Sequence, residues 1–222
     1  MSDEMFCYQC EQTAGGRACA GRAGVCGKTS EVAMLQDELT GALVGLANTV
    51  EAPTPEIDSL VRRALFATLT NVDFDADSIR AMTDEVRKAS GAKGEIQMSS
   101  VWCAQEDIRS LKSLILFGVR GMAAYAYHAA VLGYKDEEIH RFLYKALFAV
   151  GMDDWGMDEL LPIVLEVGEV NLKCMAMLDK ANTETFGNPE PTEVTLTVEK
   201  GPFIVISGHD LYDLKLLLEQ TE

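Results

Sequence analysis

Apolar side chains recur at helical spacing over most of the chain. Three such stripes lie between residues 30 and 90, carried for example by Leu35, Leu39 and Leu43 in the first. Each stripe follows a residue suited to cap a helix. These starts are Thr29 or Ser30, Thr54 before Pro55, and Asp75 or Asp77. The pattern therefore predicts three consecutive amphipathic helices.

A second set of helical stripes covers residues 105–132, 136–150 and 157–182, and Gly133 is placed to end the first of them. The best candidate for a linker between the two sets is residues 90–100, which are rich in glycine and serine. We therefore expect a mainly α fold. A helical domain over residues 30–188 should contain two three-helix bundles, with a break near residues 90–104.

The pattern changes after Gly187. Residues 193–198 alternate in polarity and residues 203–206 form a short apolar run, as strands do. A tight turn with His209 follows, and then helical periodicity from Leu211 onward. Strand, turn and helix open an α/β domain. Residues 189–222 are thus expected to be the truncated start of an α/β (Rossmann-like) domain.

The first 29 residues have almost no hydrophobic periodicity but hold Cys7, Cys10, Cys19 and Cys26 in a C-x2-C-x8-C-x6-C pattern. Such a segment buries too little apolar surface to order itself, so another source of order is needed. A C-x2-C pair brings two thiolates to one metal, and two further cysteines complete a four-thiolate set. Residues 1–29 are therefore predicted to be an iron–sulfur cluster-binding loop.

Zinc is the alternative metal, since four thiolates suit it equally well in charge and geometry. Zinc ribbons usually carry two C-x2-C pairs, whereas the second pair here is spread by six residues. The spacing favours iron–sulfur, but ligand softness does not separate the two metals. Both remain open on the residues alone.

The composition limits the kinds of partner that this chain is expected to bind. With 35 acidic and 19 basic residues the net charge is −16, and no basic surface for nucleic acid is visible. Residues 1–6 do not resemble a secretory signal, and no long uncharged apolar run suggests a membrane span. We expect a cytoplasmic protein, in which clustered cysteines indicate metal binding rather than disulfides.

Several segments resemble hybrid cluster (prismane) proteins, the hydroxylamine reductase family. The resemblance begins with MFCYQCEQTAG at residues 5–15, GVCGK at 24–28 and LQD at 35–37. It continues through LFATLTN at 65–71, GMAAYAYHAAVLG at 121–133, NTETFGNPE at 182–190 and ISGHDL at 206–211. Essentially the whole chain is covered, as the N-terminal portion of a longer protein.

The resemblance implies that the four cysteines hold a conventional cluster, 4Fe–4S in many members and 2Fe–2S in others. It also implies a hybrid iron–sulfur–oxygen cluster as the active site of the complete protein, with His209 matching its histidine ligand. Members reduce hydroxylamine to ammonia, and nitric oxide reduction and a role in nitrosative stress are attributed to them. An electron-donor reductase would be the partner.

Two further alternatives stay open for this chain. It could be a stand-alone electron-transfer module with one cluster and no complete catalytic site. The carbon monoxide dehydrogenases are similar in fold, but their cysteine pattern differs.

Single residues outside these motifs are expected to be structural. We expect His128 in the core, His140 at the surface, and Cys103 and Cys174 as buried small apolar residues. The positions of Trp102 and Trp155 are explained equally well by packing in the core and by a role in an electron-transfer path.

Overall fold

The computed structural model describes residues 7, 9–10, 19–70, 72–208 and 210–222, and in this part of the chain it is mainly helical, as predicted. The helices of the first set are α1 (Ser30–Thr49), α2 (Pro55–Ala67) and α3 (Ala76–Ser90). The others are α4 (Ser99–Trp102), α5 (Glu106–Val131), α6 (Glu137–Gly151), α7 (Met157–Phe186) and α8 (Leu211–Thr221).

The predicted caps begin the first three helices. The hydroxyl of Thr29 accepts from the amide of Val32, and that of Thr54 accepts from the amide of Ile57 with Pro55 next to it. Asp75 caps α3 in the same way. Each cap satisfies an amide that has no partner inside its helix, so the helix starts are decided locally.

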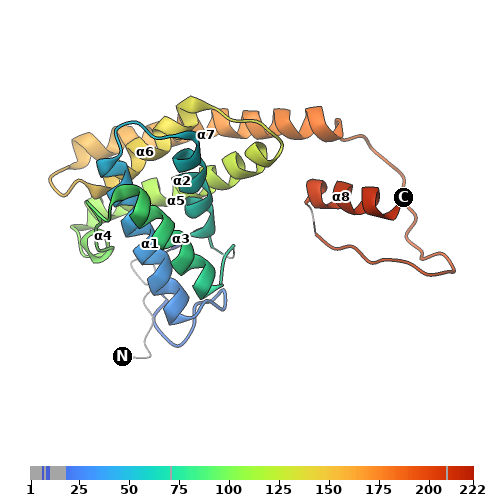
Figure 1. Cartoon of the computed structure of the whole chain (residues 1–222), viewed down its shortest axis with the longest axis horizontal. Coiled ribbons are helices and arrows are strands. Elements are labelled where there is room, and N and C mark those ends of the chain that lie inside the picture. The colour runs from blue at the N-terminus through green and yellow to red at the C-terminus, as the bar shows by residue number, and fades with distance from the viewer. Residues whose placement is uncertain (1–6, 8, 11–18, 71, 209) are drawn as a thin grey trace.

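The two predicted groups of three helices are present, and they share one core. α1, α2 and α3 pack together, as do α5, α6 and α7, while α1 also packs on α6 and α2 on α5 (Figure 1). A continuous set of buried side chains runs through both groups, from Leu39 in α1 to Leu116 in α5 and Cys174 in α7. The burial of Cys174 confirms the prediction.

α5 is long and apolar enough, by length and composition alone, to cross a membrane. Its place in the fold accounts for that composition, because α5 packs against α2, α6 and α7. Ile115, Val119 and Met122 on this helix are fully buried. Core helices of globular proteins meet the same criteria, so this feature does not indicate a membrane segment.

The predicted linker is folded tightly against α1. Gly41 and Gly45 let the backbone of residues 93–96 approach the helix, since a Cβ added to Gly41 would lie 2.2 Å from the carbonyl oxygen of Ile96. The unpredicted helix α4 follows, with Val101 and Trp102 buried. The break between the helical sets therefore packs against α1, and Met98, Val101 and Trp102 at its end join the core.

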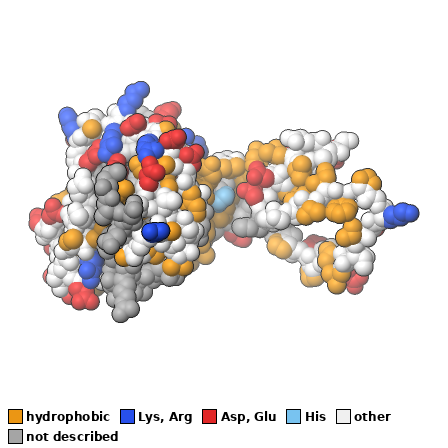
Figure 2. Space-filling model, turned by 90° about the horizontal axis from the view of Figure 1, so that it is seen from below, with side chains coloured by type: hydrophobic (Ala, Val, Ile, Leu, Met, Phe, Trp, Pro, Cys, Tyr) orange, Lys and Arg blue, Asp and Glu red, His pale blue; other side chains and the backbone are white. Residues whose placement is uncertain are grey.

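The C-terminal part contains the predicted helix α8, capped by Asp210. The two predicted strands are not formed: residues 193–198 and 203–206 have no strand assignment. A strand needs a neighbour for its backbone hydrogen bonds, and the described residues provide none to this segment. Its apolar side chains remain exposed, including Leu196, Phe203 and Val205. Figure 2 shows hydrophobic side chains gathered on this projecting part.

Candidate metal centre

Two of the four motif cysteines lie side by side. Cys7 and Cys19 form an antiparallel bridge, in which each amide donates to the other's carbonyl at 3.2 and 3.3 Å. Cys7 is buried and packs with Ala33 of α1 and with Cys19. The first and third cysteines of the motif thus meet through backbone pairing next to α1.

The remaining two cysteines lie in adjoining turns. Cys26 is half-buried in a turn closed by hydrogen bonds from the Gly24 amide to the Lys28 carbonyl (2.8 Å) and from the Gly27 amide to the Gly24 carbonyl (2.9 Å). Cys10 is also half-buried. Within the described residues no three His, Cys, Asp or Glu side chains gather closely enough to hold a metal ion. The assignment of all four cysteines as ligands remains a prediction.

His209, the fifth predicted ligand, lies outside the described residues. The next residue, Asp210, caps α8, because its side chain accepts hydrogen bonds from the amides of Tyr212 and Asp213. The strand that was expected to lead to His209 is not formed. His209 as a ligand therefore stays a prediction from resemblance.

A layer of mostly buried polar side chains from the cysteine loop and from α1 connects the two segments. The ammonium of Lys28, 1% exposed, donates to Gln36 Oε1, and Gln9 Nε2 donates to Asp37 Oδ1. Gln36 in turn donates to the carbonyl of Asp73 at 3.0 Å. The bonds made by Lys28 and Gln9 attach the loop to α1.

Arg120 of α5 completes this layer and is fully buried. Its Nε donates to the hydroxyl of Thr68 and its Nη2 to the hydroxyl of Thr40, both at 3.0 Å. Its Nη1 has no hydrogen-bond partner among the described residues. A buried guanidinium with an unused donor is unusual, because desolvated charges ordinarily satisfy their donors.

Opposite charges in this layer influence one another. Burial raises the pKa of Asp37 to about 6, although Arg120 and the indole of Trp102 favour its charged form. Burial lowers the pKa of Arg120 to about 10, against the attraction of Asp37 and Cys7. Burial also raises the pKa of Cys7, and the nearby Lys28 partly offsets this. The interior next to Cys7 is therefore both desolvated and cationic.

The types of side chain present fit a cluster held by thiolates, although no three of the described cysteines gather around one point. All six cysteines are thiols rather than disulfides, and cysteine thiolates are the ligands of iron–sulfur clusters. Four thiolates bring negative charge, which the buried cations Lys28 and Arg120 would offset. The unused Nη1 donor of Arg120 is the kind of group that hydrogen bonding around a cluster employs.

The sequence interpretation assigned no role to Gln9, Lys28, Asp37 and Arg120. One signal was available for Arg120 alone. Arg120 lies in an apolar stretch between Val119 and Met122, whereas Asp37 has polar neighbours on both sides. Charged residues inside apolar stretches are rarely buried unless they are paired. Their convergence from two helices required the tertiary structure.

Three single-residue predictions were wrong. Cys103 is exposed, and so is His128, whose ring contacts those of Phe66 and Tyr127. His140 is largely buried, with its Nε2 3.0 Å from Arg62 Nη1 and its Nδ1 3.6 Å from Asp58 Oδ2. Helical spacing places a residue on a face, but the neighbouring helices decide whether that face is covered.

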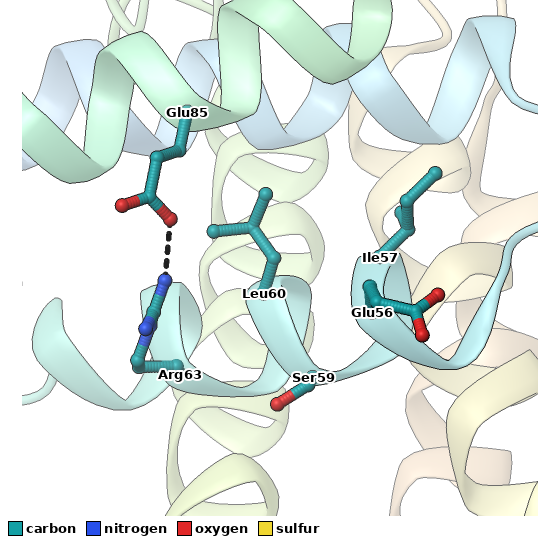
Figure 3. Close-up of a pocket in the computed structure, with 6 residues that line it drawn as sticks. All are labelled: Glu56, Ile57, Ser59, Leu60, Arg63 and Glu85. Carbon is teal, nitrogen blue, oxygen red and sulfur yellow. Dashed lines mark hydrogen bonds and ion pairs between the residues drawn. The ribbon is translucent and has the colours of Figure 1, made fainter.

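Apart from the cysteine loop, a pocket of about 410 Å³ lies between α2 and α3 (Figure 3). Arg63 and Glu85 form an ion pair of 2.5 Å across it, and Leu60 supplies part of its apolar wall. Both charged side chains are about half exposed. The pocket includes none of the predicted ligands.

Comparison with known proteins gives one family and a set of relatives. The model of the Prismane/CO dehydrogenase family matches residues 5–222. The hydroxylamine reductase of Acetivibrio thermocellus is 44% identical, and those of Clostridium novyi and Desulfitobacterium hafniense are each 41% identical. Each alignment covers 98% of this chain but 46% of the relative. The chain thus spans about half the length of these curated relatives.

Proposed function

We propose, because this chain belongs to the Prismane/CO dehydrogenase family, that it binds a 4Fe–4S cluster through Cys7, Cys10, Cys19 and Cys26. An iron–sulfur cofactor in general follows from the family. The cluster type and the ligand set are our proposal, and 2Fe–2S is the alternative nuclearity. When bound, such a cluster supplies one-electron transfer.

The observation that carries this proposal is the pairing of Cys7 with Cys19. Their mutual backbone hydrogen bonds bring together two cysteines that are separated by Cys10 and the loop after it. Lys28 and Arg120 add positive charge next to this pair. Lys28, Gln9 and α1 would hold the loop in position, while burial of Cys7 keeps water from one side of the site.

For the complete protein we propose the reduction of hydroxylamine to ammonia. The support is the name of the relatives, each called hydroxylamine reductase. His209 would be a ligand of a hybrid iron–sulfur–oxygen cluster there, and nitric oxide would be a further substrate. An electron-donor reductase would supply the cysteine-bound cluster. We place the protein in the cytoplasm, where its cysteines would stay reduced.

A second function applies to these 222 residues taken alone, namely electron transfer by one cluster. It is favoured by the location of all four cysteine ligands in residues 7–26. Hydroxylamine turnover separates the two functions. Turnover by the 222-residue chain with a chemical reductant would support the enzyme, and its absence from a cluster-loaded chain would support the module.

The test of the cluster is analysis of the chain purified without oxygen. We expect about four iron and four acid-labile sulfide per chain and the electron paramagnetic resonance signal of a reduced 4Fe–4S cluster. Two iron and two sulfide would indicate the 2Fe–2S alternative. Zinc in place of iron, or neither iron nor sulfide, would overturn the proposal.

A further inference from the structure

Arg120 combines three features that packing alone does not require. It is fully buried, its Nη2 donates to Thr40 of α1, and its Nη1 is unused among the described residues. Thr40 lies one helical turn from Gln36 and Asp37, whose side chains accept hydrogen bonds from Lys28 and Gln9 of the cysteine loop. Thr40 and Thr68 fix its other nitrogens at 3.0 Å. The guanidinium is therefore held in one position with donor capacity remaining.

We propose that Arg120 is a positioning residue for the cysteine-bound cluster, and that its buried charge raises the reduction potential of that cluster. The inference rests on the proposed cluster at Cys7, Cys10, Cys19 and Cys26. The carboxylate of Asp37 has the opposite effect on the potential. The sequence motifs identify the ligands but assign no such role to α5.

The physical reason is the charge of the site. Reduction adds one electron to a site that four thiolates already make negative, and a nearby cation favours the reduced form. The effect of a charge is larger in a desolvated interior than in water. Because an arginine side chain keeps its proton throughout the range of such experiments, its contribution is a fixed charge.

The experiment compares midpoint potentials of the cluster-loaded full chain at pH 8. We expect Arg120→Gln to shift the potential to a more negative value and Arg120→Lys to stay near the parent. Asp37→Asn should shift the potential in the opposite, positive direction. A purely structural role would not separate the two charge-neutralising variants by sign, because both would simply weaken cluster binding.

Lys112→Met is the matched control. Lys112 is another buried cation of α5, roughly 12 Å along the helix from Arg120 at 1.5 Å per residue, and its ammonium donates to the Met152 carbonyl at 2.9 Å. It should leave the potential unchanged. If Arg120→Gln does not fold, the double variant Asp37→Asn/Arg120→Gln removes both charges together, and its potential should lie below that of Asp37→Asn.

An unchanged potential in Arg120→Gln, or equal shifts in Arg120→Gln and Lys112→Met, would overturn the inference while leaving the cluster intact. Shifts of the same sign in Arg120→Gln and Asp37→Asn would do the same. Lack of iron and sulfide in the parent chain is a different result, because it removes the proposed cluster itself.

Discussion

Gln9 of the cysteine loop donates a side-chain hydrogen bond to Asp37 of α1, 28 residues further along the chain. The other carboxylate oxygen of Asp37 lies 3.4 Å from the indole nitrogen of Trp102 in α4. One half-buried carboxylate therefore joins the cysteine loop, α1 and the segment that was expected to be a linker. Disturbance of the helical core should consequently reach the proposed cluster site.

Replacement of Cys19 tests the ligand set. We expect Cys19→Ser to lose most of the iron and sulfide, because a serine hydroxyl is a poor substitute for a thiolate in an iron–sulfur cluster. The matched control is Cys103→Ser, which changes an exposed cysteine and should keep the parent content. A fully loaded Cys19→Ser chain would show that Cys19 is no ligand.

Removal of the Gln36 side chain should destabilise the fold. Gln36→Leu leaves the buried ammonium of Lys28 without its acceptor, and an unsatisfied buried polar group costs about 1–3 kcal/mol, more when charged. Urea unfolding of the cluster-free chain measures this. Gln220→Leu, at an exposed position of α8, should change stability by less than about 0.5 kcal/mol.

The double variant Lys28→Met/Gln36→Leu separates the two parts of this loss. It removes the Lys28 ammonium together with its acceptor Gln36, so part of the lost stability should return. If the double variant is no more stable than Gln36→Leu, the Lys28–Gln36 bond is not the cause of the loss.

Glycine substitutions test the packing of residues 93–96 on α1. Gly41→Ala would force a methyl group to 2.2 Å from the Ile96 carbonyl oxygen, and such overpacking destabilises by about 1–3 kcal/mol. Gly168→Ala, in α7 with no atom near the added Cβ, should instead stabilise by about 0.5–1 kcal/mol. Thermal unfolding should therefore move in opposite directions for the two variants.

The buried histidine should make stability depend on pH. Burial lowers the pKa of His140, and the adjacent Arg62 acts in the same direction while Asp58 opposes them. The unfolded chain therefore takes up the proton first as the pH falls below about 6.5. Stability from this group is present above that pH and is lost as the pH falls toward the lower folded value.

Melting temperatures between pH 7.5 and 5.5 check this. His140→Gln should show a weaker acid destabilisation than the parent chain, because the titrating group is gone. His128→Gln, which changes an exposed histidine, should follow the parent profile. Identical profiles for all three chains would contradict the role of His140.

What the sequence determined by itself is local. Helix starts depend on a cap and the next few amides, so Thr54 could be identified without a structure, and Thr29 and Asp75 as one of two candidates each. The C-x2-C-x8-C-x6-C spacing predicts a metal site in the same local way, because its four cysteines lie within one short segment, and this stays a prediction. The family resemblance of these motifs agrees with the family match over residues 5–222.

What only the tertiary structure decided depends on residues far apart in the chain. The exposure of His128 and Cys103, the burial of His140, and the close packing of residues 93–96 on Gly41 and Gly45 all follow from how helices cover one another. The buried site of Arg120 is of the same kind. A buried charge becomes stable only when packing supplies its partners, and the partners of Arg120, Thr40 and Thr68, lie outside its own helix.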